Sequence, residues 1–290
     1  MEDNAYTGGI AMNNILDNQI SWINGHWIKH NEPQLPINDR GLTLSDGIFE
    51  TILIMNNQPI LLNAHLDRWN ESAILLGMAK PPTKDHILSL IKEAINKNPL
   101  AQGSAVLRLN WSRGDNNGRG IKLSSANAKS SSHRFWLTLR AYKPSFKPIT
   151  TMISKLEQRN ANSKINQCKT FAYTQSIQAR REANIAGFDD ALLLSTNGEI
   201  ACGTTSNLIV KRRDKWLTPH ISSGCLPGIM RQQGLNSGIL KEAKISPEPE
   251  PKDQWLLINS LSCHSIIKVN TKSFEEYEAS KILWTSLTKS

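Results

Sequence analysis

The chain has 290 residues and a formal net charge of +9 at pH 7, a length that suits two modest domains. Its lysines and arginines are scattered and not interleaved with aromatic residues, which argues against a nucleic-acid surface and favours attraction of anionic small-molecule substrates. The sequence has no apolar run of about 18 residues for a membrane span and no apolar stretch typical of a secretory signal, so we expect a cytoplasmic protein. The four cysteines show no CxxC spacing, so we expect reduced thiols and no metal site.

The first half of the chain combines helical and strand-like patterns. Apolar residues at spacings of three and four predict a helix over 63–78 and a second helix that Thr83 caps and that ends near Asn98. Apolar or alternating runs over 104–111 and 135–139 predict strands.

The second half also mixes the two kinds of element. We predict a helix over 170–186 and another that begins at Gly228. Strands are predicted over 152–154, 190–195, 199–202, 206–211, 255–258 and 266–269. Such mixing in both halves indicates two α+β domains.

Two prolines within five residues, Pro144 and Pro148, interrupt the strand-like pattern between the halves. Proline cannot donate to a sheet ladder and restricts the residue before it, so a linker is expected here. The predicted organisation is an N-terminal overhang over 1–18, a smaller domain over 19–142, a linker over 143–148 and a larger domain over 149–290.

Several motifs occur in one order along the chain. They are Ile23-Asn24-Gly25, Asp39-Arg40-Gly41 with Asp46-Gly47-Ile48-Phe49-Glu50-Thr51, Ala64-His65-Leu66-Asp67-Arg68-Trp69, Leu107-Arg108-Leu109 with Arg113-Gly114, and the stretch from Lys169 to Gly228. Together they resemble the class IV (fold type IV) pyridoxal-phosphate enzymes over roughly residues 20–270. This family includes branched-chain and D-amino acid aminotransferases and 4-amino-4-deoxychorismate lyase.

The resemblance implies a D-amino acid aminotransferase-like α+β fold of two domains, with pyridoxal 5'-phosphate in the cleft between them, and a homodimer. Lys169 stands where the family has the lysine that binds the cofactor and then removes the substrate α-proton. A lone lysine is most often a solvated surface residue, but the surrounding motifs favour the cofactor role. Lys164 is a weaker candidate because its spacing to the downstream segments does not match.

The resemblance also implies a set of cofactor contacts. Arg68 would clamp the phosphate with its guanidinium, although a surface pair with Glu71 is the simpler alternative. Further contacts would come from the backbone amides of Ile229 and Met230 at a helix start, from Ser260, and from Tyr173 to the cofactor's phenolic oxygen. An ordinary helix start and a buried structural tyrosine are the corresponding alternatives.

Cys202 departs from the family pattern. The family typically has a glutamate here, which keeps the pyridine nitrogen protonated and makes the ring an effective electron sink. A thiol is a weak hydrogen-bond partner and is mostly uncharged at neutral pH. Glu199 would point to the opposite face of a strand and cannot replace that glutamate without a bulge.

The substrate is indicated less directly. Gly228-Ile229-Met230-Arg231-Gln232 and the loop around Arg119 resemble aminodeoxychorismate lyases, in which Arg119 would bind a substrate carboxylate, unless it is an ordinary loop arginine. The leading hypothesis is therefore a lyase that converts 4-amino-4-deoxychorismate to p-aminobenzoate and pyruvate in folate biosynthesis. The alternatives are a branched-chain or D-amino acid aminotransferase and, because of Cys202, a non-catalytic protein built on the enzyme fold.

Overall fold

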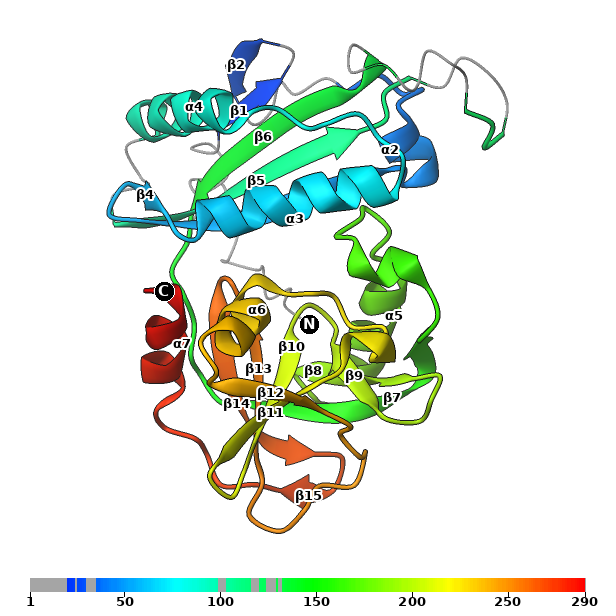
Figure 1. The fold of residues 1–290 in the computed structure, drawn as a ribbon, viewed down its shortest axis with the longest axis vertical. Helices are drawn as coiled ribbons and strands as arrows, with labels where there is room; N and C mark the ends of the chain where they lie inside the picture. The colour runs from blue at the N-terminus through cyan, green and yellow to red at the C-terminus, as the bar shows by residue number, and fades with distance from the viewer. Residues whose placement is uncertain are drawn as a thin grey trace, which may run out of the picture. The chain divides into compact units, whose positions relative to one another are not determined.

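The computed structural model describes residues 20–23, 25–29, 35–98, 103–115, 120–123, 129 and 132–289. Its contacts divide the chain into two compact units, Met1–Lys143 and Pro144–Ser290. Each unit contains both helices and strands (Figure 1). The overhang predicted over 1–18 lies outside the described residues.

The first unit is built on an antiparallel sheet of six strands. Its strand order is β2-β1-β6-β5-β3-β4. The strands are β1 (Ile20–Ile23), β2 (His26–Lys29), β3 (Gly47–Met55), β4 (Gln58–Pro59), β5 (Ser104–Ser112) and β6 (Arg134–Ala141), and the helices are α2 (Arg40–Leu44), α3 (Leu62–Leu75) and α4 (Lys84–Lys97).

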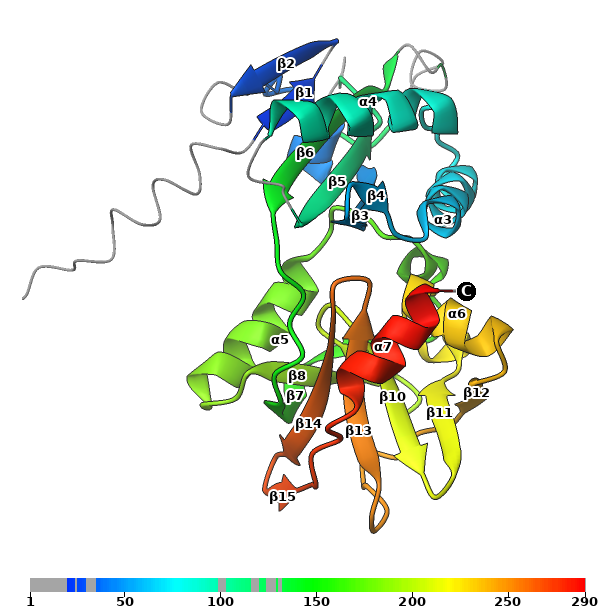
Figure 2. The ribbon, with the colours of Figure 1, turned by 90° about the vertical axis from the view of Figure 1, so that its left-hand side faces the viewer.

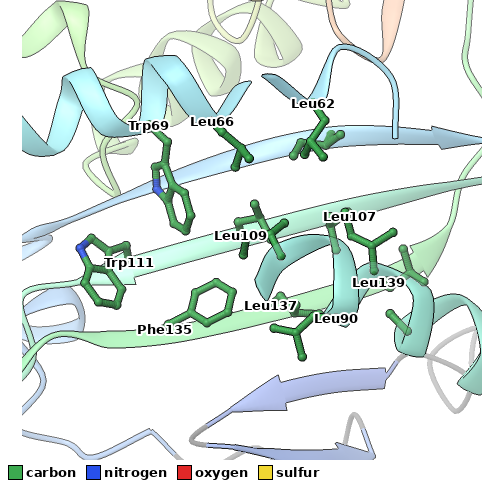
Figure 3. Packing of buried hydrophobic residues seen from close by; sticks show 14 of the residues in the cluster. Leu62, Leu66, Trp69, Leu90, Leu107, Leu109, Trp111, Phe135, Leu137 and Leu139 are labelled. Atoms are coloured by element: carbon green, nitrogen blue, oxygen red, sulfur yellow. The ribbon is translucent and has the colours of Figure 1, made fainter. Parts of the chain in front are cut away.

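The core of the first unit lies between this sheet and helices α3 and α4. Side chains of one face of the sheet, from β3, β5 and β6, form a single cluster with the apolar stripes of the two helices (Figure 3). Each fully buried leucine in such a cluster contributes about 1.5–3 kcal/mol relative to an exposed one. The predicted cap of the second helix is confirmed, because Thr83 Oγ1 accepts a hydrogen bond from the backbone N–H of His86.

The DRG and DG motifs of the first unit form an ionic network. The Asp46 carboxylate accepts hydrogen bonds from Arg40 at 2.8 Å and from Arg113 at 2.9 Å. Arg113 also donates to the backbone carbonyls of Leu76 and Gly77, just beyond the end of α3. These motif residues therefore connect α2 and the ends of β3 and β5 to the end of α3. The two arginines and the aspartate are needed together because each hydrogen bond in this network requires its partner.

The second unit contains a sheet of nine strands. Its path is β12-β11-β10-β13-β14-β7-β8-β9, with β15 paired to β14. The strands are β7 (Ile149–Arg159), β8 (Asp190–Ser195), β9 (Ile200–Gly203), β10 (Asn207–Arg212), β11 (Lys215–Pro219), β12 (Leu240–Ala243), β13 (Gln254–Asn259), β14 (Ser262–Val269) and β15 (Lys272–Ser273). The sheet curls, because β9 at one end of the path also contacts β10 and β11.

Helices cover this sheet and short 3₁₀ turns connect it. Figure 2 shows α5 beside β7 and β8, and α7 near β13 and β14. The helices are α5 (Thr174–Ile185), α6 (Ile229–Asn236) and α7 (Ser280–Thr288), and the turns are η4 (Lys164–Gln167) and η5 (Ile221–Ser223). The helix predicted over 170–186 was wrong at its start: residues 170–173 are not helical, and α5 begins at Thr174. Within the described residues, no helix is both long and apolar enough to cross a membrane.

Candidate active site

Lys169 lies between η4 and α5 in the second unit. The preceding residue, Cys168, is buried and anchors the segment, whereas Lys169 itself is half-buried. Its Nζ donates a hydrogen bond to the hydroxyl of Tyr173 at 2.8 Å. Lys164, the alternative lysine, is exposed in η4. The structure therefore places Lys169 as an amine that is partly removed from water and oriented by a phenol, as a nucleophilic lysine requires.

The start of α6 offers backbone donors. Ile229 and Met230 occupy the first two positions of the helix, so their N–H groups have no acceptor within it. Gly228 precedes them, and a Cβ at this position would lie 1.9 Å from Oδ1 of Asn207. Only glycine therefore allows this approach, which fixes the helix start against β10. Free N–H groups and the helix dipole make such a start suitable for a phosphate.

Ser260 and Cys202 lie at the same end of the sheet as this helix start. Asn207 begins β10 and pairs with Ile258 near the end of β13, so the β13–β14 turn that carries Ser260 is at this end. Cys202 is the penultimate residue of β9, which a short loop joins to Asn207. The topology thus gathers three of the predicted cofactor positions at one edge of the second unit.

Cys202 is buried, with an exposed fraction of 4%. Burial raises the pKa of its thiol above the usual value, while the charge of Arg159 and a hydrogen bond from its side chain lower it by less and the Asp190 carboxylate raises it slightly. The thiol is therefore uncharged at neutral pH. Glu199 lies in the turn before β9 and not on the strand, so the expectation that it occupies the opposite strand face was wrong. It supplies no carboxylate at the position of Cys202.

Arg159, at the end of β7, was not identified from the sequence. Its Nη1 donates to Gln175 at 3.1 Å and its Nη2 to Ser176 at 3.0 Å, both in the first turn of α5. Its Nε is buried and has no oxygen or nitrogen acceptor among the described residues, while its side chain lies within hydrogen-bonding reach of the Cys202 thiol. The position of this guanidinium beside Cys202 cannot be predicted from a lone arginine at a strand end.

A second arginine fixes the loop that follows Cys202. Arg180 of α5 donates to Thr204 at 2.7 Å and forms an ion pair with the buried Asp190 at 2.6 Å, and Thr204 donates to the same carboxylate. Burial raises the pKa of Asp190, while Arg180 opposes this effect. The network connects the helix after Lys169 to the loop after Cys202, so the two segments are positioned together.

Arg68 is a residue of α3 in the first unit, and its side chain is buried. Its Nε and Nη2 donate to the Glu50 carboxylate at 2.8 and 2.6 Å, and His65 Nδ1 lies 2.7 Å from the same carboxylate. The surface pair with Glu71 is therefore not formed. Burial would raise the pKa of Glu50, but Arg68 and His65 outweigh it and lower the pKa to about 2.

The residues of the second unit fit an aldehyde cofactor that carries a phosphate. They provide an oriented amine at Lys169, backbone donors at the start of α6 and a buried guanidinium at Arg159 beside Cys202. Arg119, the predicted substrate residue, lies outside the described residues. In the described part of the chain, no cluster of three or more histidine, cysteine, aspartate or glutamate side chains is arranged to hold a metal ion.

The family model of amino-transferase class IV matches residues 47–269, more than three quarters of the chain. The chain belongs to the class IV aminotransferase family. Members of this family are enzymes that use pyridoxal phosphate, and they include aminotransferases and lyases. The predicted resemblance and the predicted cofactor are thereby confirmed.

Relatives of this class IV chain carry both activities in their names. The chain is 29% identical to a "Probable branched-chain-amino-acid aminotransferase" of Rickettsia felis, over 73% of this chain and 71% of the relative. It is 24% identical to the aminodeoxychorismate lyase of Bacillus subtilis, again over 73% of this chain and 71% of the relative. The names alone therefore do not distinguish a transferase from a lyase.

The fold of the chain is similar to that of a branched-chain aminotransferase from Thermoproteus uzoniensis, crystallised with norvaline. The TM-score is 0.81 over 92% of this chain and 93% of the other, at 18% sequence identity. This likeness confirms the fold type IV architecture predicted from the motifs. At 18% identity, this likeness shows the fold of the chain and not its substrate.

Proposed function

We propose that this class IV enzyme is a pyridoxal-phosphate-dependent lyase that converts 4-amino-4-deoxychorismate to p-aminobenzoate and pyruvate. The observation that carries the proposal is the uncharged, buried Cys202 beside Arg159, at the position where the family pattern has a carboxylate. The lyase named in Bacillus subtilis and the Gly-Ile-Met-Arg-Gln sequence at the start of α6 also support it.

The reaction suits a site that withdraws electrons weakly. Removal of a proton from the carbon that bears the amine, with departure of the enolpyruvyl group, gives an aromatic ring and pyruvate without water or an oxidant. Aromatisation supplies driving force that a transamination lacks. The cofactor, when bound, supplies the conjugated system that acidifies this proton.

The residues of the chain have separate tasks in this proposal. The Lys169 amine would hold the cofactor and accept the proton from the substrate, while Tyr173 orients Lys169 through the 2.8 Å hydrogen bond. The amides of Ile229 and Met230, with Ser260 and Arg68, would hold the phosphate. Arg119 would bind a substrate carboxylate. The enzyme would act as a cytoplasmic homodimer in folate biosynthesis.

The test combines cofactor mapping with product analysis. Borohydride reduction of the protein with added pyridoxal phosphate, followed by peptide mapping, should label Lys169 in the native protein and in Lys164→Ala, but give no label in Lys169→Ala. Incubation with 4-amino-4-deoxychorismate should give p-aminobenzoate and pyruvate in equal amounts. One product without the other, or neither, would refute the lyase.

The second candidate is a branched-chain or D-amino acid aminotransferase, and the names of several relatives favour the branched-chain activity. It predicts that an amino acid alone converts the bound cofactor to its pyridoxamine form. If neither this half-reaction nor the lyase products appear, while Lys169 is still labelled, the non-catalytic alternative holds. Cys202→Glu then distinguishes a decayed site from one that never catalysed, since only a decayed site regains activity.

A further inference from the structure

Two charged groups act on Cys202: the Arg159 guanidinium, and the Asp190 carboxylate, which Arg180 and Thr204 already bind. Cys202 itself offers an S–H group, because burial raises the pKa of the thiol. Arg159 offers a buried Nε–H that has no oxygen or nitrogen acceptor among the described residues, and its side chain lies within hydrogen-bonding reach of the Cys202 thiol. Its other two nitrogens are held by Gln175 and Ser176 at 3.1 and 3.0 Å, so the guanidinium cannot turn away without losing both bonds.

We propose that Arg159 replaces the family's glutamate as the partner of the cofactor's pyridine nitrogen, and that it keeps this nitrogen unprotonated as a hydrogen-bond acceptor. The inference rests on the proposed use of pyridoxal phosphate at Lys169. A cation beside a basic nitrogen disfavours a second positive charge there, by the same physics that lowers the pKa of a lysine near an arginine. A neutral thiol does nothing to offset this effect.

Other charged groups near Cys202 do not restore the missing anion. Asp190 of β8 is the carboxylate that reaches Cys202 electrostatically, but Arg180 and Thr204 already bind it. Cys225, after η5, is buried in the same cluster as Cys202, and burial raises its pKa to about 11. Arg231 of α6 and Glu242 both act on Cys225, but they form an ion pair with each other, so Glu242 offers no free carboxylate and the pair adds no net charge.

An unprotonated pyridine nitrogen has a consequence for reaction choice. It accepts electron density poorly, so a carbanion next to the cofactor is stabilised less than in an enzyme with a glutamate at this position. Reactions that need a long-lived carbanion, such as transamination, become slow. A reaction in which proton removal leads directly to loss of a leaving group and an aromatic product is affected least. Arg159 would thus set the reaction type of the site.

The direct test is ¹⁵N NMR of the holoenzyme loaded with pyridoxal phosphate labelled at the pyridine nitrogen, with the free cofactor in acid and in base as references. Borohydride trapping first verifies that each variant carries the cofactor on Lys169. The native protein and Cys202→Ala should show the unprotonated resonance at pH 7, because both retain Arg159. Cys202→Glu should move the resonance towards the protonated reference.

Arg159→Gln keeps a polar side chain but removes the charge. It should raise the pH at which the nitrogen protonates by about one to three units, the range of a nearby charge. A protonated nitrogen in the native protein, or a titration that Arg159→Gln leaves unchanged, would overturn the inference. The results distinguish failure of this inference from failure of the proposed function. If borohydride gives no label on Lys169, both proposals are wrong. If the nitrogen is unprotonated but no p-aminobenzoate forms, only the lyase proposal is wrong.

Discussion

Replacing Glu50 by glutamine should destabilise the first unit strongly, because the change breaks a buried ion pair. Glu50 is 1% exposed, and its carboxylate receives two hydrogen bonds from Arg68, whose side chain is 8% exposed. The amide of glutamine would direct N–H groups at a partner that is itself a donor. The Arg68 charge would then stay buried without a counter-ion, which costs about 3–5 kcal/mol.

The pKa of Glu50 gives an independent magnitude. A lowering from 4.5 to about 2 corresponds to about 3 kcal/mol of stabilisation. Because the pKa is lower in the folded state, this contribution is complete above about pH 4.5 and is lost as the pH falls towards about 2. The native protein should therefore lose stability over this interval, and Glu50→Gln should lack that component.

Urea unfolding at pH 7 and at several acidic pH values measures both effects. Hydrogen exchange of peptides from β3 and α3 assigns the loss to the first unit. The matched control is Glu71→Gln, an exposed change three residues from Arg68, which should alter the free energy of unfolding by no more than about 0.5 kcal/mol. A loss below about 1 kcal/mol for Glu50→Gln would show that the buried ion pair does not stabilise the unit as argued.

Three further outcomes are expected. Thr83→Ala should lower the free energy of unfolding by about 0.5–1 kcal/mol, at the lower end for a helix cap because the hydrogen bond from His86 is long at 3.5 Å. Thermal unfolding should show that Thr83→Ser, which keeps the hydroxyl, retains the native stability. Gly228→Ala should weaken pyridoxal-phosphate binding at least about tenfold, because its Cβ would collide with Asn207 and shift the start of α6, while the exposed Gln232→Ala should not. Tyr173→Phe should lower turnover by about five- to tenfold through loss of one hydrogen bond to Lys169, and an unchanged rate in steady-state assays would contradict that role.

Local patterns predicted much of the secondary structure. The helix capped by Thr83 and the strands around 104–111 and 135–139 follow from side-chain periodicity, and the structure has them within one or two residues. The start of α5 was misplaced because residues 170–173, which follow Lys169, form an irregular segment in which the Tyr173 hydroxyl accepts a hydrogen bond from Lys169. Propensity is a weak guide where packing decides.

The site was predicted only in part. Lys169, Tyr173 and the start of α6 could be named because their motifs are local and ordered along the chain. The partner of Arg68 was missed, although Glu50 stood within a quoted motif, because 18 residues separate the two side chains. The alternation of side chains along a strand could have indicated that Glu50 is buried, since it shares a face of β3 with Ile48 and Ile52 of the core.

The sequence by itself determined the family, the cofactor and the absence of a glutamate at position 202, since each of these is written in the identity of residues at particular positions. Only the tertiary structure decided which charge stands beside Cys202. Arg159 and Cys202 are 43 positions apart on β7 and β9, strands that each pair with β8, and no local pattern relates them. Burial then sets their chemistry, because a thiol and a guanidinium in a low-dielectric core respond to each other far more strongly than they would in water.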